Sequence, residues 1–137
     1  ISYLGNYENI EEILPCADLV IQPSEHESFG LVALEAMACE VPVIVTASGG
    51  VKEVVLQGET GYLCEVGDIE TMAGYAINLL SNPEQTQQMG RKGREHVLRH
   101  FQKDAIVSQY EALYKEVLEM RVERMGLTNR DHPKHQA

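Results

Sequence analysis

Two glutamates, Glu27 and Glu35, have seven residues between them, and these begin with Ser28, Phe29 and Gly30. A carboxylate binds paired hydroxyl groups well, because each of its oxygens accepts a charge-assisted hydrogen bond. Two acids on either side of a helix start therefore suit an elongated ligand with hydroxyl groups at both ends. A pair of solvated surface carboxylates has the same spacing, so the spacing alone does not decide between the two interpretations.

The residues between the glutamates predict an anion site. A short apolar run over 19–22 reads as a strand, and a helix is expected to begin near Gly30. The free N–H groups of Gly30, Leu31 and Val32 would then favour a phosphate at the helix N-terminus. Gly30 is expected to let the ligand approach the backbone, and Phe29 to anchor the loop in the core. Carboxylates on both sides of a phosphate site suit a ligand that has a sugar, a phosphate and a second sugar in series. A nucleotide sugar has this arrangement.

Apolar runs alternate with helical patterns along the chain. Strands are predicted at 1–5, 19–22, 41–46 and 62–66, and helices at 8–17, 30–38 and 69–80, from Pro83 onward and at 104–124, with a short segment at 51–55. This alternation predicts an α/β fold with right-handed crossovers and a parallel sheet. In such sheets ligands bind beyond the carboxyl ends of the strands, where the Glu27 loop is expected.

Two helices show a clear amphipathic pattern. Asp68 is placed to cap the first of them. Their apolar residues are expected to face inward: Ile69, Met72, Ala73, Ala76, Ile77 and Leu80 in one helix, and Ile106, Val107, Tyr110, Leu113, Tyr114, Val117 and Leu118 in the other.

The stretch ESFGLVALE, from Glu27 to Glu35, is followed by EAMACEVPVIVTASGGVKEVV and GETGYLCEVGD. Together they resemble the E-x7-E signature region of retaining glycosyltransferases of the GT-B fold, and the resemblance runs from about residue 1 to residue 118. It implies that residues 1–125 are part of a Rossmann-like C-terminal donor-binding domain with closing helices, and that 126–137 form a flexible tail. TGYLCEVGD and IVSQYEALY are most similar to members that transfer N-acetylglucosamine from UDP to L-malate, the first step of bacillithiol synthesis.

The resemblance also implies roles for the site residues. Glu27 would be catalytic and hold hydroxyls of the transferred sugar, and Glu35 would hold the ribose hydroxyls of UDP. The backbone amides would meet the sugar and the diphosphate, and they belong to Ser28, Phe29, Gly30, Leu31 and Val32. The acceptor would attack on the sugar face from which UDP departs, so no protein nucleophile is expected. The chain has no Asp-x-Asp pair to bind a divalent metal, so neither a metal nor a cofactor is expected. The small-molecule acceptor would bind an N-terminal domain outside this chain.

Composition excludes several classes of function. A net charge of −10 disfavours nucleic acid and anionic lipid, because both need clustered basic residues. The three cysteines lack the spacing of a disulfide framework or a zinc site. No apolar run approaches the roughly 18 residues of a membrane span, and we expect a cytoplasmic protein.

Four positions carry separate expectations. Glu40 replaces a glycine that the family usually has at the end of this helix. A left-handed backbone there costs a non-glycine residue about 1–2 kcal/mol, so the helix end is expected either to differ or to be slightly strained. Lys52 is expected to alter the start of the segment before Glu53, which reads as local structure. His26 reads as an exposed loop residue. The basic residues Arg91, Lys92 and Arg94 read as a solvated helix face.

Three hypotheses remain open from the sequence. The chain is part of an enzyme's donor domain, a non-catalytic module that binds nucleotide sugars, or a structural fragment that a partner copy completes as a homo-oligomer. An uncovered sheet edge is expected for the chain alone.

Overall fold

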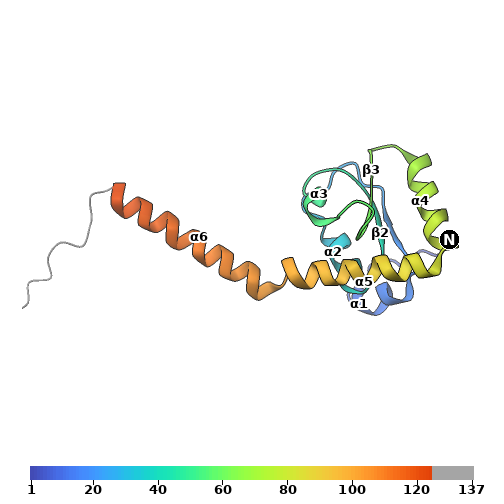
Figure 1. Ribbon diagram of the computed structural model, residues 1–137, viewed down its shortest axis with the longest axis horizontal. Coiled ribbons are helices and arrows are strands. Elements are labelled where there is room, and N and C mark those ends of the chain that lie inside the picture. Colours follow the sequence, from blue (N-terminus) through green and yellow to red (C-terminus); the bar gives the residue numbers. More distant parts are fainter. Residues whose placement is uncertain (125–137) are drawn as a thin grey trace, which may run out of the picture. The chain divides into compact units, whose positions relative to one another are not determined.

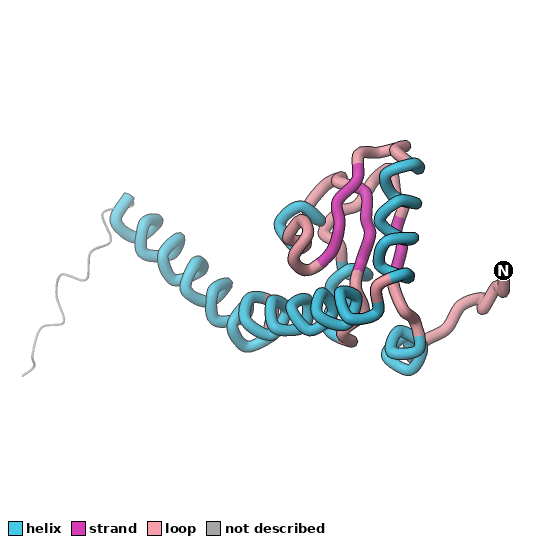
Figure 2. Tube along the Cα trace, turned by 45° about the vertical axis from the view of Figure 1, so that its right-hand side comes forward, coloured by secondary structure: helices cyan, strands magenta, loops and turns pink. Residues whose placement is uncertain are grey.

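The computed structural model describes residues 1–124. Residues 1–99 form one compact unit around a three-stranded parallel sheet in the order β1-β2-β3 (Figures 1 and 2). The strands are β1 (Val20–Gln22), β2 (Val43–Thr46) and β3 (Gly61–Cys64). The predicted α/β fold with a parallel sheet is confirmed. The expected tail at 126–137 lies outside the described residues.

The helices follow the predicted order. They are α1 (Ile10–Ile13), a 3-10 turn η1 (Leu14–Cys16), α2 (Leu31–Ala38), α3 (Val51–Val54), α4 (Ile69–Ser81) and α5 (Pro83–His100). Asp68 caps α4 as predicted, since its carboxylate accepts the Thr71 N–H at 3.1 Å. The second unit, residues 100–137, contains α6 (Lys103–Arg124).

The core lies on both faces of β2. All four residues of β2 are buried, as expected for a β-branched run at the centre of a parallel sheet. On one face α4 packs against β2 and β3 (Figure 2), and Ile44 is buried with Cys64, Met72, Ala76, Leu79 and Met89. The helix α2 packs against β1 and β2.

The C-terminal end of α2 is held by α5. Glu40 has a φ of 62°, so of the two expected outcomes the structure has the strained one, a left-handed backbone at a residue other than glycine. A Cβ on Gly90 would lie 1.9 Å from the Glu40 carbonyl oxygen, so glycine lets α5 approach this turn. Arg94 donates to the Ala38 carbonyl and forms an ion pair of 3.7 Å with Glu40. Arg94 is exposed, as predicted for a solvated helix face, and its guanidinium also satisfies an end carbonyl of α2.

β1 has an open edge. Its residue Ile21 aligns with Ile44 of β2 and Tyr62 of β3, yet Ile21 is 45% exposed whereas Ile44 is fully buried. Residues 1–5, which were predicted as a strand, are not a strand, and residues 1–10 are exposed. Among residues 1–124, β2 is the one strand that pairs with β1. An extended apolar run becomes a strand only when a neighbour accepts its hydrogen bonds.

The inward faces predicted for two helices were partly wrong. In α4, Met72 and Ala76 are buried, and Leu79 is buried as well, whereas the others are exposed: Ile69, Ala73, Ile77 and Leu80. A sheet of three strands is too narrow to cover the whole apolar face of α4. In α6, Ile106 is half-buried, and the remaining predicted inward residues are exposed: Val107, Tyr110, Leu113, Tyr114, Val117 and Leu118. The period of a helix shows which residues share a face but does not show whether anything covers that face.

Candidate functional site

The loop between β1 and α2 is fixed by the segment that follows β2. Thr46 donates its hydroxyl hydrogen to the Ser24 carbonyl, and the Gly50 N–H donates to the Ser28 carbonyl at 3.2 Å. Gly49 has a φ of 58°, and a Cβ there would lie 1.6 Å from the Glu27 carbonyl oxygen. The backbone around Glu27 is therefore held by the end of the neighbouring strand.

The Glu27 side chain folds back onto its own loop. Its Oε1 accepts the Gly30 N–H at 3.0 Å and the Phe29 N–H at 3.3 Å. Its Oε2 accepts from the Gln22 amide nitrogen at 2.6 Å. The expectation that the Gly30 N–H is free for an anion was therefore wrong, because the Glu27 carboxylate already occupies it.

These bonds keep Glu27 ionised. The Gly30 N–H, followed by the Phe29 N–H, lowers the pKa of the Glu27 carboxyl below its ordinary value, because both bonds favour the charged form. Gln22 acts in the same direction with a smaller effect. At neutral pH the site therefore presents a fixed anionic acceptor.

Gly30 has a conformational role in the structure. Its φ is 95°, and a Cβ there would lie 3.0 Å from the Val51 side chain, so glycine allows both the turn and the approach of α3. Phe29 is 46% exposed, so the prediction that it anchors the loop in the core was wrong. The backbone turn and the Glu27 bonds hold the loop.

The helix α2 begins at Leu31. Its first N–H groups, at Leu31 and Val32, have no acceptor within the helix, as at any helix start. Leu31 and Val32 are exposed, and Glu35 is exposed in the second turn. Glu35 and these N–H groups belong to one rigid element that follows directly on the Glu27 loop.

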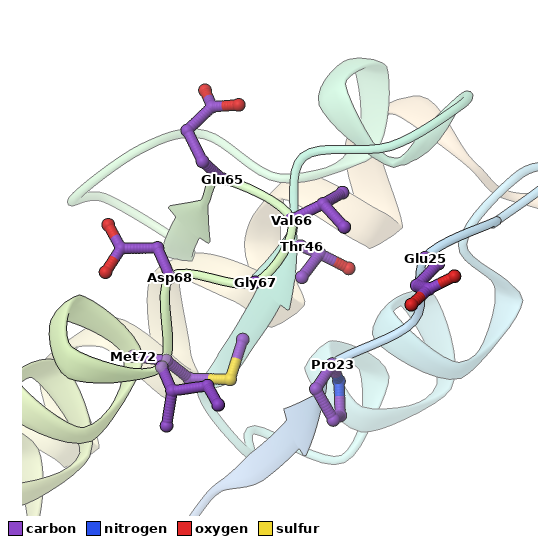
Figure 3. Close-up of a pocket in the computed structure, with 9 residues that line it drawn as sticks. Pro23, Glu25, Thr46, Glu65, Val66, Gly67, Asp68 and Met72 are labelled. Atoms are coloured by element: carbon purple, nitrogen blue, oxygen red, sulfur yellow. The ribbon is translucent and has the colours of Figure 1, made fainter.

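A shallow hollow adjoins Glu27. It is lined by His26, Glu27, Ser28, Ser48 and Gly49, so it lies between the two loops that follow β1 and β2. His26 is exposed, as predicted. A second hollow of about 170 Å³ lies at the same edge of the sheet (Figure 3).

The second hollow contains neither of the two predicted glutamates. Its walls include Pro23 and Glu25 after β1, Thr46 at the end of β2, and the turn from Glu65 to Asp68 after β3. Figure 3 shows the Glu65 and Asp68 carboxylates pointing away from Thr46, so these acids do not converge on one point. Within residues 1–124 no group of three His, Cys, Asp or Glu side chains could hold a metal ion.

Sequence reasoning missed three residues of the Glu27 site. One of them, Gln22, ends β1 and donates to the Glu27 carboxylate. The other two, Ser48 and Gly49, follow β2 and line the hollow at Glu27. A signal existed for Gln22, which is a polar residue at the end of an apolar strand. Buried atoms without a hydrogen-bond partner among the described residues include Gln22 Oε1 and Ser48 Oγ.

Residues 1–96 match the family model described as glycosyl transferases group 1. The chain belongs to this family. As a group 1 glycosyltransferase segment, it is 52% identical to N-acetyl-alpha-D-glucosaminyl L-malate synthase of Bacillus anthracis over 116 residues, which are 85% of this chain and 30% of that enzyme. The chain spans about a third of the length of such relatives.

Solved glycosyltransferase structures share the fold. HepE of Anabaena in complex with UDP has a TM-score of 0.79 and 26% identity, covering 82% of this chain and 31% of HepE. The C-terminal domain of the group 1 protein LpcC from Francisella tularensis has a TM-score of 0.67 and 29% identity, covering 75% of this chain and 53% of that domain. This group 1 segment thus has a Rossmann-like α/β fold of the GT-B kind. No helix within residues 1–124 is both long and apolar enough to cross a membrane.

Proposed function

We propose that this chain forms part of the UDP-sugar site of a retaining glycosyltransferase, with Glu27 on the transferred sugar and Glu35 on the ribose. The observation that carries the proposal is the Glu27 carboxylate, ionised and fixed by three hydrogen bonds next to the N-terminus of α2. Its location at the carboxyl edge of a parallel sheet is where ligands of such folds bind. The UDP complex of HepE, a structural relative, supports a uridine nucleotide as ligand.

Glu27 acts in this proposal by positioning the sugar. A carboxylate has about two acceptor sites on each oxygen. Oε1 uses both of its sites for the Gly30 and Phe29 N–H groups, whereas Oε2 accepts one bond from Gln22 and keeps a site for a sugar hydroxyl. A clamp on sugar hydroxyls holds the reacting carbon in line for attack without forming a bond to it. UDP is a good leaving group, so stabilisation of charge on the diphosphate contributes the rest of the rate.

The diphosphate would meet the first turn of α2. The Gly30 and Phe29 N–H groups are bonded to Glu27, which leaves the N–H groups of Leu31 and Val32 for a phosphate oxygen. A helix N-terminus supplies only about half a unit of positive charge. The net charge of −10 opposes any anion, so we expect the 137-residue chain alone to bind the donor with millimolar or weaker affinity.

UDP-N-acetylglucosamine is the proposed donor and L-malate the proposed acceptor. The support is the 52% identity to the Bacillus anthracis synthase that is named for these groups. The acceptor would bind residues that lie outside this chain, so we expect no transfer by the chain alone.

Binding is tested on the 137-residue chain by nuclear magnetic resonance, which detects millimolar affinities. UDP-N-acetylglucosamine should shift the amides of residues 28–32, and Glu35→Gln should weaken binding roughly tenfold, because a charge-assisted hydrogen bond is lost. Glu53→Gln is the matched control, since it removes the same charge from an exposed helical position. Equal weakening by both variants would contradict the ribose role of Glu35.

Catalysis is tested in a chimera, in which this chain replaces the homologous segment of the Bacillus anthracis synthase. The chimera should transfer N-acetylglucosamine to L-malate, and Glu27→Gln should lower its turnover roughly a hundredfold. Donor binding without any transfer by a folded chimera would instead favour a non-catalytic binding module. Full turnover by Glu27→Gln would refute the assignment of Glu27.

A further inference from the structure

Gln22 is a polar residue at the end of a strand with a rigid backbone. It pairs with Val45 in the parallel ladder of β1 and β2, so its Cα is fixed by the sheet. Its amide nitrogen donates to Glu27 Oε2 at 2.6 Å, the shortest of the three bonds to that carboxylate. The strand thereby holds the side chain of a residue in the loop that follows it.

The arrangement has a cost at Gln22 itself. Its Oε1 is buried and has no hydrogen-bond partner among residues 1–124. A buried acceptor without a partner destabilises the fold, because it has lost its bonds to water. An apolar side chain of similar size would avoid this cost, so the amide contributes mainly through its bond to Glu27.

The two oxygens of Glu27 are held by different parts of the structure. The loop amides of Gly30 and Phe29 bind Oε1 alone, which leaves the carboxylate able to turn about that oxygen. The bond from Gln22 to Oε2 removes this freedom and sets the plane of the carboxylate. Without this bond, the carboxylate would lose its remaining rotational freedom only when the ligand binds.

We infer that Gln22 is a positioning residue, which orients the Glu27 carboxylate before the donor sugar arrives. The inference rests on the proposed function of Glu27. Gln22 is suited to this task because it is neutral: it donates a hydrogen bond without cancelling the charge that the sugar hydroxyls meet. The other side chains that line the hollow at Glu27 are His26, Ser28 and Ser48. Among residues 1–124, Gln22 is the one residue whose side chain donates to the Glu27 carboxylate.

The first test measures Glu27 directly in the 137-residue chain. Carboxyl carbon resonances of labelled glutamate give the pKa of Glu27 as the pH is varied. In Gln22→Leu this pKa should rise but remain below its ordinary value, because the Gly30 and Phe29 N–H bonds persist. In Gln22→Glu it should rise further, because a second carboxylate then faces the first.

The matched control is Gln85→Leu. Gln85 is also half-buried. It lies in α5 and donates to the Tyr62 hydroxyl, and it does not line the hollow at Glu27. Its replacement should leave the Glu27 pKa unchanged. An unchanged Glu27 pKa in Gln22→Leu, or an equal change in Gln85→Leu, would overturn the role of Gln22.

The second test measures turnover in the chimera. Gln22→Leu should lower kcat roughly tenfold and change the KM for UDP-N-acetylglucosamine by less than about twofold, because a misoriented clamp still binds the ground state. A kcat equal to that of the Gln85→Leu chimera would overturn the inference. Full turnover by Glu27→Gln would instead refute the proposed function, whatever the Glu27 pKa does in Gln22→Leu, so the two failures are distinguishable.

Discussion

Replacing Gly49 with alanine tests the contact between the two loops of the site. A Cβ at this position would lie 1.6 Å from the Glu27 carbonyl oxygen, whereas real Cβ atoms stay at least 3.0 Å from such an atom. The distance between this Cβ and the Glu27 carbonyl oxygen must therefore increase by about 1.4 Å. This displacement is comparable to half the length of the hydrogen bonds that hold the Glu27 side chain. We expect Gly49→Ala to displace the Glu27 loop and to break at least one of those bonds.

Gly58→Ala provides a matched control for the backbone strain. Gly58 has a φ of 73°, similar to the 58° of Gly49, but a Cβ there would meet no atom within 4 Å. Each alanine incurs the cost of a left-handed backbone, about 1–2 kcal/mol. Gly49→Ala should incur a further cost of about 1–3 kcal/mol, as is typical of an overpacked site.

The assay is urea denaturation of both variants, with the free energy of unfolding extrapolated to water. Amide resonances of Phe29 and Gly30 report the Glu27 bonds in the same samples. Equal losses of stability in Gly49→Ala and Gly58→Ala, with unchanged amide resonances, would refute the close contact between the loops.

Three further predictions concern the elements around the site. Glu40→Gly should raise the free energy of unfolding by about 1 kcal/mol, because it relieves a left-handed backbone and removes only an exposed ion pair. A lower free energy of unfolding in urea denaturation would show that the ion pair contributes more than the strain costs. Arg94→Ala should lower that energy by about 1–2 kcal/mol, because the Ala38 carbonyl loses a charged donor, and Arg94→Lys should restore part of it. Asp68→Ala should lower the melting temperature at neutral pH. The Thr71 hydroxyl and N–H lower the pKa of Asp68 in the folded state. The cap therefore stabilises the fold above the ordinary pKa of aspartate, and this stabilisation is lost as the pH falls through the pKa of the folded state. A difference in melting temperature between Asp68→Ala and the unchanged chain that persists at pH 2 would contradict this.

The sequence predicted those elements whose signals are local. The strand at Val43–Thr46 and the cap at Asp68 were predicted correctly, because a β-branched run and a capping residue act within a few positions of themselves. The run at 1–5 was not a strand, because strand formation depends on a neighbour. The exposed Ile77 in α4 shows the same limit for a helix face.

The loop that carries Glu27 was predicted in its location but not in its contacts. The loop after β1 and the start of α2 were found from the break in the apolar pattern at Pro23 and from Gly30. The return of the Glu27 side chain to its own loop was not predicted, because it depends on the turn that Gly30 makes. The contact with Gly49 depends on strand register, which brings together residues that are distant in the chain.

The open edge of β1 makes the association of this chain with itself dependent on protein concentration. Within the described residues 1–124, β1 pairs along one edge and its Ile21 is half-exposed. Its other edge offers its backbone to any other strand, including that of a second molecule. Pairing between molecules removes apolar surface from water, so it is favoured as the protein becomes more concentrated. Melting temperatures and titrations of this chain therefore need to be compared at one fixed, low protein concentration, where edge-to-edge association is suppressed.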